Sequence, residues 1–436
     1  MGIIKYELVD KAVTSWGGMR MMKVLLDKLE IKEYMKEIPL PKPGSNRRYD
    51  PIHIIENFWI SIWIGASRFA HSSWLRYDKV LKEIFNWKEA PSQSTYSRFF
   101  NKFNMQLNNE IFIGLNRWFF EKIKITSVTI DLDSAVMTRY GEQEGSKVGY
   151  NPHKPGRSSH HPLIAFMAET RMVINSWLRP GNTAAISNFE GFLEETLEIL
   201  SDKKIGLVRA DSGFYSDRFL NYLERHKLNY IVSVKLYEPI KYMIFEESKE
   251  WITLKDGIQI KETKYKALSW EKERRFVIVR KQIEKYPKAS GKILLFETPP
   301  QYRYSVYVTN LDLPAVQIWN MYKDRGDAEN RIKELKYDFA IDGFCMKKFW
   351  ATEAAFRMAI FAYNLMSLFR HIVLQNHPQS TLNTLKFKCF ALGSWVVKSS
   401  KGKVLKISTY GRKRHWLEGL FSKIDNASPP FVFPNA

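Results

Sequence analysis

Cysteine is scarce in this sequence, whose 436 residues include only Cys345 and Cys389. These two residues lie far apart and lack the paired spacing of a disulfide framework or a cysteine zinc site, so neither is expected. Such low cysteine use favours a reducing, cytosolic compartment. The first ten residues, MGIIKYELVD, lack the architecture of a signal peptide.

Long hydrophobic runs are also missing. The most apolar stretches, around 58–66 and 358–368, are interrupted by Arg68, Arg357 and Asn364 and fall short of a membrane span, so no membrane location is expected. Acidic residues are outnumbered, 46 against 67 lysines and arginines, which gives a formal net charge of +21. This excess predicts a polyanionic partner, either nucleic acid or an anionic membrane surface, and favours nucleic acid.

The stretch 319–336, WNMYKDRGDAENRIKELK, has a pattern typical of a helix face. Tyr322, Arg325, Glu329 and Lys336 fall within an arc of roughly 60° on one continuous α-helix. A carboxylate flanked by cations stays ionised and is suited to a divalent cation. The alternative is an ordinary solvated helix with pairs of opposite charge.

Two acidic residues share a face of a predicted strand. In ITSVTIDLDSAVMTRYG, alternation places Asp131 and Asp133 on the face opposite Ile130 and Leu132. A buried strand carrying two carboxylates needs a metal ion or cationic partners, because unpaired buried charge is costly. The alternative is an edge strand that turns this face to water.

A third acidic position ends another predicted strand. KKIGLVRADSGFYSDRFLNYLERHKLNYIVSVK predicts a βαβ unit in which Asp211 follows the strand 205–210. The crevice beyond the carboxyl ends of strands is where α/β folds place their chemistry. The alternative is that Asp211 or Ser212 caps a helix beginning near Tyr215.

Two segments suggest contacts with nucleic acid. SQSTYSRFFNKFN, from Ser92, resembles the second helix of a helix-turn-helix in which Arg98 faces a groove, although its aromatic residues at helical spacing are more typical of a core. The polar loop 143–162 contains Lys154, Arg157 and three histidines. No cysteine or glutamate completes a familiar zinc spacing there, so phosphate contact is the favoured interpretation.

The remaining chain divides into predicted regions. Residues 1–120 are expected to be a helical DNA-binding region, 121–236 the first part of an α/β core, and 237–303 an inserted β-rich subdomain. Residues 304–375 are expected to hold a strand, the signature helix and an apolar helix. Residues 376–436 form a basic region, whose stretch 398–416 either follows a phosphate backbone or is a disordered tail.

Together these segments resemble the DDE transposases of bacterial insertion sequences, in the group with a Tyr-x2-Arg-x3-Glu-x6-Lys signature. That signature is complete here in Tyr322, Arg325, Glu329 and Lys336. The resemblance spans roughly 92–371. It also includes DLDS from Asp131, the YNPHKPGRSSHHPL loop, the LRPGN turn, RADSGFY, and the VTNL strand before the signature.

The resemblance implies a ribonuclease-H-like catalytic core. Its first aspartate lies on the first strand, its second after the fourth strand, and its glutamate on a later helix. In this sequence they are Asp133, Asp211 and Glu329, with Asp131 as the other candidate for the first position. The Asp-Ser pair favours Asp133. The long separation of Asp211 and Glu329 agrees with relatives that carry a β-rich insertion.

The resemblance also implies a function. The three carboxylates would hold two Mg²⁺ ions, with Mn²⁺ able to substitute, while Arg325 and Lys336 bind phosphates and Tyr322 positions DNA. The expected protein binds terminal inverted repeats, cleaves the element's ends, through a hairpin in relatives with this signature, and joins them to target DNA. It would act as a homodimer on DNA in the bacterial cytoplasm, associated with the nucleoid. Two alternatives are an inactive, DNA-binding derivative of a transposase and a structure-selective ribonuclease-H-like nuclease.

Overall fold

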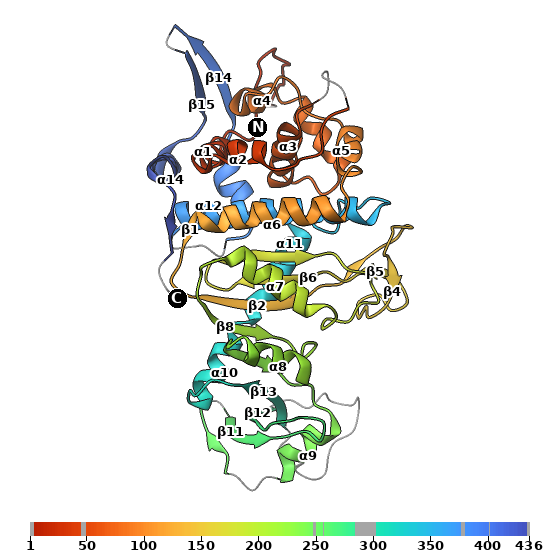
Figure 1. Ribbon diagram of the computed structural model, residues 1–436. Helices are drawn as coiled ribbons and strands as arrows, with labels where there is room; N and C mark the ends of the chain where they lie inside the picture. Colours follow the sequence, from red (N-terminus) through yellow and green to blue (C-terminus); the bar gives the residue numbers. More distant parts are fainter. Residues whose placement is uncertain are drawn as a thin grey trace, which may run out of the picture.

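A computed structural model describes residues 4–44, 49–246, 250–255, 257–283, 302–375, 380–400 and 402–433. Figure 1 shows the chain in layers, with N-terminal helices above, two long helices below them, and a large sheet beneath. In the part described, Cys345 and Cys389 are free thiols. Both observations agree with a mixed α/β protein that folds without disulfides.

The centre of the molecule is a sheet of mixed strand direction. Its inner strands lie in the order β7-β6-β2-β8-β9. The pairs β7–β6 and β6–β2 are antiparallel, whereas β8 is parallel to both β2 and β9. The βαβ unit predicted from the sequence is therefore present, and β6 and β7 form a hairpin. These strands are β2 (Val128–Ser134), β6 (Leu163–Met167), β7 (Met172–Trp177), β8 (Ile205–Ala210) and β9 (Tyr230–Ser233), with α7 (Phe189–Leu200) and α8 (Asp217–Arg225) between them.

Strand β2 is interior to the sheet. It is hydrogen-bonded to β6 on one side and β8 on the other, and every residue from Ile130 to Asp133 is buried. The edge-strand alternative is therefore wrong. Because both faces of β2 are covered, each of its two carboxylates requires a partner inside the protein.

The sheet continues past β9 instead of stopping there. Strand β13 (Tyr302–Thr309) pairs with β9, and β12 (Arg274–Gln282), β11 (Ile258–Tyr265) and β10 (Ile252–Thr253) follow outward, giving nine strands in all. The expected insertion, which also holds α9 (Glu238–Glu246), thus extends the core sheet rather than forming a separate one. Residues 284–301 of that range lie outside the described residues. Local patterns predicted the strands but not their pairing, because pairing depends on the exposed edge of β9.

The described residues of the region 1–120 are mainly helical from Met19 onward, in line with the prediction. Its helices pack above α12 (Phe349–Val373), and almost every residue of α12 is buried. The indoles of Trp59 and Trp63 donate hydrogen bonds to the carbonyls of Met358 and Ala362 at 3.2 and 3.1 Å. A helix that is apolar all round must be covered on every side, and here the sheet and the upper helices cover it. The upper helices are α1 (Met19–Leu29), α2 (Ile31–Glu37), α3 (Pro51–Trp63), η1 (Phe69–Arg76), α4 (Lys79–Phe85), α5 (Gln93–Phe100) and α6 (Met105–Glu121).

Among the helices of the described residues, none is long and apolar enough to cross a membrane. This includes α12, whose buried arginines and glutamate keep its hydropathy below that of a spanning segment.

The C-terminal region is folded and returns to the N-terminal helices. Strands β14 (Ser394–Ser399) and β15 (Gly402–Ile407) form a two-stranded ribbon, followed by α14 (Gly411–Asn426). Ser394 bridges to Thr14, and β16 (Phe431–Val432) pairs with β1 (Ile123–Lys124). The disordered-tail alternative is therefore wrong for the described residues. The preceding turns are α13 (Leu382–Leu385) and η2 (Lys386–Phe390).

Candidate active site

The signature segment is broken into two helices. α10 (Ala315–Lys323) ends at Asp324, and α11 begins at Gly326 and runs to Tyr337. Hydrogen bonds from Arg325 N–H to the Tyr322 carbonyl (3.0 Å) and from Ala328 N–H to the Arg325 carbonyl (2.8 Å) tighten the chain at the junction. The prediction of one continuous helix is therefore wrong. Glycine at this point weakens the helix, and α10 packs instead against the outer strands β11 and β12.

The signature side chains nevertheless converge on the carboxyl ends of β2 and β8. The Tyr322 hydroxyl lies 3.4 Å from the carbonyl of Ala210, the last residue of β8. Arg325 Nη2 donates to the Leu132 carbonyl at 2.9 Å, and Lys336 Nζ donates to the Val136 carbonyl at the same distance. These side chains therefore fasten α10 and α11 to the strand ends.

Burial distinguishes these side chains from ordinary DNA contacts. Arg325 is only 6% exposed, and Tyr322 and Lys336 are partly buried. Burial raises the pKa of Tyr322 to about 12 and lowers that of Lys336. The structure thus gives all three a contact within the protein, where the sequence predicted contacts with DNA.

Asp133 lies near the carboxyl end of β2 and is 7% exposed. Its Oδ2 is 3.2 Å from Arg325 Nη2, and its Oδ1 accepts a hydrogen bond from the Ser134 N–H at 2.8 Å. Burial raises the pKa of Asp133 to about 6. The charges of Asp211 and Glu329 also raise it, and Arg325 opposes the change. The negative charges of Asp211 and Glu329 therefore both favour the protonated form of Asp133.

Asp211 follows β8 directly and is partly exposed. Its Oδ1 accepts a hydrogen bond from the Gly213 N–H at 2.9 Å. The residue that caps α8 is Ser216, whose hydroxyl accepts from the Phe219 N–H, so the capping alternative for Asp211 is wrong. Glu329 is exposed in the first turn of α11. Both carboxylates thus keep oxygens directed away from the core.

Asp131 has a different environment, with no exposed surface at all. Both of its oxygens accept hydrogen bonds from Arg209, at 2.6 Å from Nε and 2.9 Å from Nη2, and Arg331 Nη1 lies 3.8 Å away. The cationic partner that a buried strand acid requires is therefore an arginine here. The carboxylate is committed to holding β2, β8 and α11 together.

Sequence reasoning missed Arg209 and Arg331. No local signal could have found Arg209, because only the parallel pairing of β2 with β8 sets it opposite Asp131. Arg331 continues the network by pairing with Asp327 at 2.9 Å, and Asp327 pairs with Arg171 at 2.8 Å. Alternating charges thus connect α11, which carries Glu329, to the sheet and to the turn between β6 and β7.

In the basic loop 143–162, the lysine and arginine side chains are exposed. Lys154 and Arg157 sit over the Tyr140 ring, at 4.9 and 6.0 Å from its centroid. His160, by contrast, is buried, accepts a hydrogen bond from Arg139 Nε at 2.9 Å, and has its pKa lowered to about 4 by burial. This histidine is neutral and structural. It fixes β5 (Ser158–His160) between β3 (Met137–Thr138) and β4 (Lys147–Val148).

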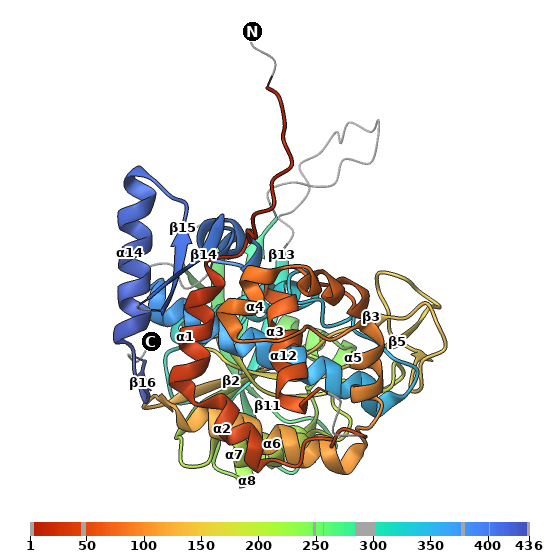
Figure 2. The same ribbon diagram turned by 90° about the horizontal axis from the view of Figure 1, so that it is seen from above.

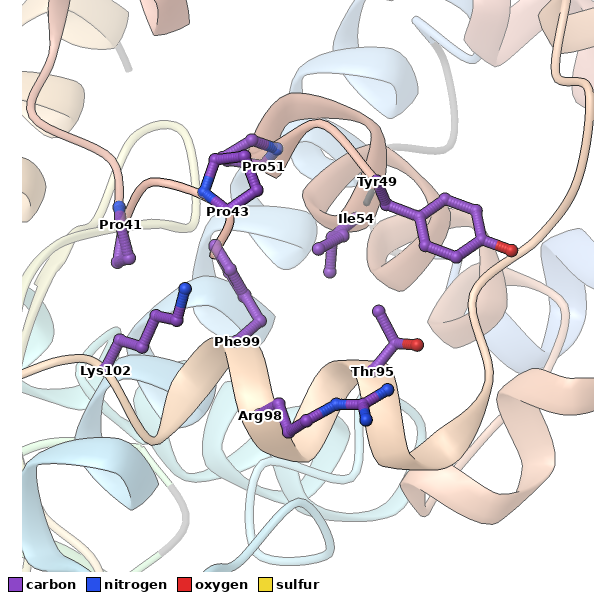
Figure 3. A pocket seen from close by; sticks show the side chains of 9 residues that line it. All are labelled: Pro41, Pro43, Tyr49, Pro51, Ile54, Thr95, Arg98, Phe99 and Lys102. Carbon is purple, nitrogen blue, oxygen red and sulfur yellow. The ribbon is translucent and has the colours of Figure 1, made fainter. Parts of the chain in front are cut away.

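The aromatic face of helix α5 is buried. This agrees with the expectation that aromatic residues at helical spacing belong to the core. Tyr96, Phe99 and Phe100 are buried, whereas Arg98 is exposed. Figure 3 shows Thr95, Arg98 and Phe99 facing a proline-rich segment across a hollow of about 150 Å³. Arg98 is therefore free to meet a partner in solution, while most of its helix supports the core. The hollow is lined by Pro41, Pro43, Tyr49, Pro51, Ile54, Thr95, Arg98, Phe99 and Lys102.

The donor set of the site suits a hard divalent cation, because its side chains offer carboxylate oxygens only. Burial is the main cause of the raised pKa of Asp133, and a cation there would also relieve the smaller contribution from the charges of Asp211 and Glu329. Over the described residues, no group of three or more histidine, cysteine, aspartate or glutamate side chains is close enough to form a ready cage. Arg325 occupies the cationic position beside Asp133.

Comparison with known proteins identifies the family. The model of the family described as "Transposase DDE domain group 1" matches residues 4–429. The chain belongs to this family. The resemblance to DDE transposases is thereby confirmed, and with it membership of a family of nucleases and transferases that generally use divalent metal ions.

A solved structure is similar to this DDE transposase as well. It is the cryo-EM structure of the piggyBac transposase synaptic complex with hairpin DNA. The similarity covers 94% of this chain and 79% of that chain, with a TM-score of 0.42 and 11% sequence identity. A search of the curated proteins found no match.

The raised pKa of Asp133 makes the stability of this DDE transposase depend on pH. Its pKa rises from 3.8 to about 6 on folding, so the folded state holds the proton more tightly and stability from this group falls between about pH 4 and 6. Replacing Asp133 with asparagine removes that loss. Between pH 4.5 and 7.5, the wild type should lose about 2 kcal/mol of unfolding free energy relative to Asp133→Asn.

Denaturant titrations of both proteins in EDTA, at the two pH values, measure this difference. Equal pH dependence in the wild type and in Asp133→Asn would show that Asp133 titrates normally and that its burial imposes no strain.

Proposed function

We propose that this protein is a transposase that binds the terminal inverted repeats of an insertion sequence, cleaves its ends and joins them to target DNA. The observation that carries the proposal is the placement of Asp133 and Asp211 at the carboxyl ends of the adjacent parallel strands β2 and β8, with Glu329 in the first turn of α11. Arg325, at the start of α11, donates a hydrogen bond to the Leu132 carbonyl at 2.9 Å, which holds α11 beside these strand ends. The charges of Asp211 and Glu329 both contribute to the raised pKa of Asp133. Such an arrangement is suited to phosphoryl transfer.

The strand arrangement supports a ribonuclease-H-like core. In chain order, β2, β6, β7, β8 and β9 include an antiparallel hairpin and two parallel pairings. Asp133 lies on the first of these strands and Asp211 directly after the fourth, the positions that the resemblance implies. The proposal assigns the first catalytic position to Asp133, since Asp131 is committed to Arg209.

Asp133, Asp211 and Glu329 would hold the divalent ions, and Mg²⁺ with Mn²⁺ as a substitute suits their oxygen-only donors. Bound there, such ions supply an activated attacking oxygen and neutralise charge on the phosphorus. The surrounding side chains would hold the carboxylates in fixed positions. Arg325 fixes the orientation of Asp133, and Tyr322 and Lys336 hold the two helices against the strand ends.

Exposed cations near these elements would position the DNA. Lys154, Arg157 and Arg98 are exposed and suited to phosphate, which accepts hydrogen bonds from either kind of cation. Both ends of an element must be cut in concert, so we propose a homodimer on DNA. We also propose excision through a hairpin at the element's end and association with the bacterial nucleoid.

The test is incubation of the purified protein with a labelled duplex that carries the inverted repeat from the DNA flanking its gene. We expect cleavage at the repeat boundary with Mg²⁺ or Mn²⁺ and none with EDTA. A second duplex, with the repeat scrambled, is the control for specificity.

Two other results would identify the competing functions. Tight binding without cleavage under either metal would indicate an inactive, DNA-binding derivative. Cleavage of branched DNA without joining to a target would indicate a structure-selective nuclease. Both results would contradict the proposed transposase.

A further inference from the structure

The C-terminal third of the chain contains a long stretch without acidic residues. Between Glu353 and Glu418 the sequence has no aspartate or glutamate, yet it contains lysines or arginines throughout. Most of the cations before residue 386 are buried in α12, whereas those on β14, β15 and the start of α14 are exposed. A positive surface without local counter-charges therefore lies on the ribbon and the following helix.

The ribbon itself carries an unfavourable pair of charges. Lys398 on β14 lies directly opposite Lys403 on β15, and both are exposed. Like charges in this cross-strand position destabilise a ribbon. Lys403 pairs with Glu83 at 2.5 Å, and the charge of Lys398 also lowers the pKa of Glu83, although no described acidic side chain forms an ion pair with Lys398. One carboxylate therefore faces two lysines at the ribbon tip, and a further anion beside them would stabilise it.

Helix α14 shows a second unfavourable arrangement. Its first turn contains Arg412, Lys413 and Arg414 and no acidic residue. The amino end of a helix carries a partial positive charge, so cations in the first turn are repelled by it. Arg414 pairs with Glu418 at 2.9 Å, while Arg412 and Lys413 remain exposed. Like the ribbon tip, this turn would gain stability from a bound anion.

We propose that the β14–β15 ribbon and the first turn of α14 form a docking surface for the phosphate backbone of duplex DNA. This proposal rests on the proposed function for the identity of the polyanion. Lys398, Arg412 and Lys413 are its main cations, because all three are exposed and none is within ion-pairing distance of a described acidic side chain. Phosphate contacts of this kind give affinity without reading sequence.

The position of this surface separates it from the catalytic site. Figure 2 shows the ribbon and α14 on one side of the molecule and the β3–β5 loop, which carries Lys154 and Arg157, on the other. The surface would therefore hold DNA at a distance from the cleaved bond. Changes there should weaken binding and leave the chemistry of bound DNA intact.

The test is fluorescence anisotropy with the labelled repeat duplex, in EDTA so that no cleavage occurs. The triple variant Lys398→Gln, Arg412→Gln, Lys413→Gln should bind at least about ten-fold more weakly than the wild type at moderate salt. Its plot of log affinity against log salt should be shallower by about 0.9 for each phosphate that the variant no longer neutralises. At saturating DNA with Mg²⁺, its cleavage rate should match the wild type.

A matched variant with the same change of charge is Lys264→Gln, Lys266→Gln, Lys281→Gln. These lysines are exposed on and beside β11 and β12, at the far end of the sheet. This matched variant should bind the repeat duplex with the same affinity as the wild type. Equal affinity of both triple variants would overturn the proposal, as would binding of phosphatidylserine vesicles in place of duplex DNA.

A charge-preserving variant separates binding from folding. Exchanging Lys398 and Lys413 for arginine and Arg412 for lysine should restore the affinity, and a weakening equal to that of the glutamine variant would also overturn the proposal. Failure of the proposed function gives a different pattern. DNA binding would then still depend on the ribbon, but no metal would support cleavage by the wild type.

Discussion

Asp211→Asn and Glu329→Gln should each lower metal-dependent cleavage by at least about 10³-fold, the scale of losing a group that stabilises transition-state charge. Each change keeps the shape of the side chain and removes one negative charge from the site. The affinity for the repeat duplex should stay nearly unchanged, because both residues lie among carboxylates and neither supplies a cation for phosphate. Single-turnover cleavage and anisotropy on the same preparations measure the two quantities.

Asp324→Asn is the matched control for these variants. Asp324 belongs to the same signature segment and is exposed at the junction of α10 and α11. It makes none of the contacts that connect Asp133 with Asp211 and Glu329, so its replacement should leave cleavage close to wild type. Full cleavage by Glu329→Gln would remove Glu329 from the site and with it the proposed arrangement of three carboxylates.

Arg209→Ala should lower the free energy of unfolding by about 3–5 kcal/mol, the usual cost of leaving one partner of a buried ion pair alone. Arg209 satisfies both oxygens of Asp131, which has no exposed surface. In the variant, the nearest remaining cation is Arg331, 3.8 Å away. Denaturant titration of the metal-free protein measures the decrease.

Two further variants test whether the loss of stability in Arg209→Ala comes from the unpaired charge of Asp131. Arg218→Ala removes an exposed arginine that pairs with Glu190, and it should cost far less stability than Arg209→Ala because solvent screens that pair. Adding Asp131→Asn to Arg209→Ala removes the stranded charge and should recover part of the stability. If Arg209→Ala costs no more than Arg218→Ala, Asp131 is not held by this pair and becomes a candidate metal ligand again.

The same comparison separates the two aspartates of β2. Asp131→Asn should reduce stability by disrupting the pair with Arg209. Asp133→Asn should instead abolish cleavage while increasing stability at neutral pH, since it removes a carboxylate whose pKa burial has raised to about 6.

Much of the fold was predictable from local patterns. Local patterns predicted β2 and the βαβ unit through Asp211, and the aromatic spacing of α5 was recognised as typical of a buried face. These patterns depend on neighbours in the chain, and their periods of two and 3.6 are visible in the residues themselves. Contacts across the sheet have no such local signal, so the extension of the core sheet by β10–β13 was missed.

The sequence by itself supplied the residues of the proposed site, which are three carboxylates and a signature with a tyrosine and two cations, and it determined the large positive charge. Tertiary structure decided how these residues are used. The signature segment forms two helices, the second of which begins at Gly326. Arg325 and Lys336 donate hydrogen bonds to backbone carbonyls at and just after the end of β2. Asp131 pairs with Arg209, whereas the pKa of Asp133 responds to the charges of Asp211 and Glu329. The physical reason is burial. A charged side chain inside a protein must find a partner, and only the packing of distant segments determines which partner lies within reach.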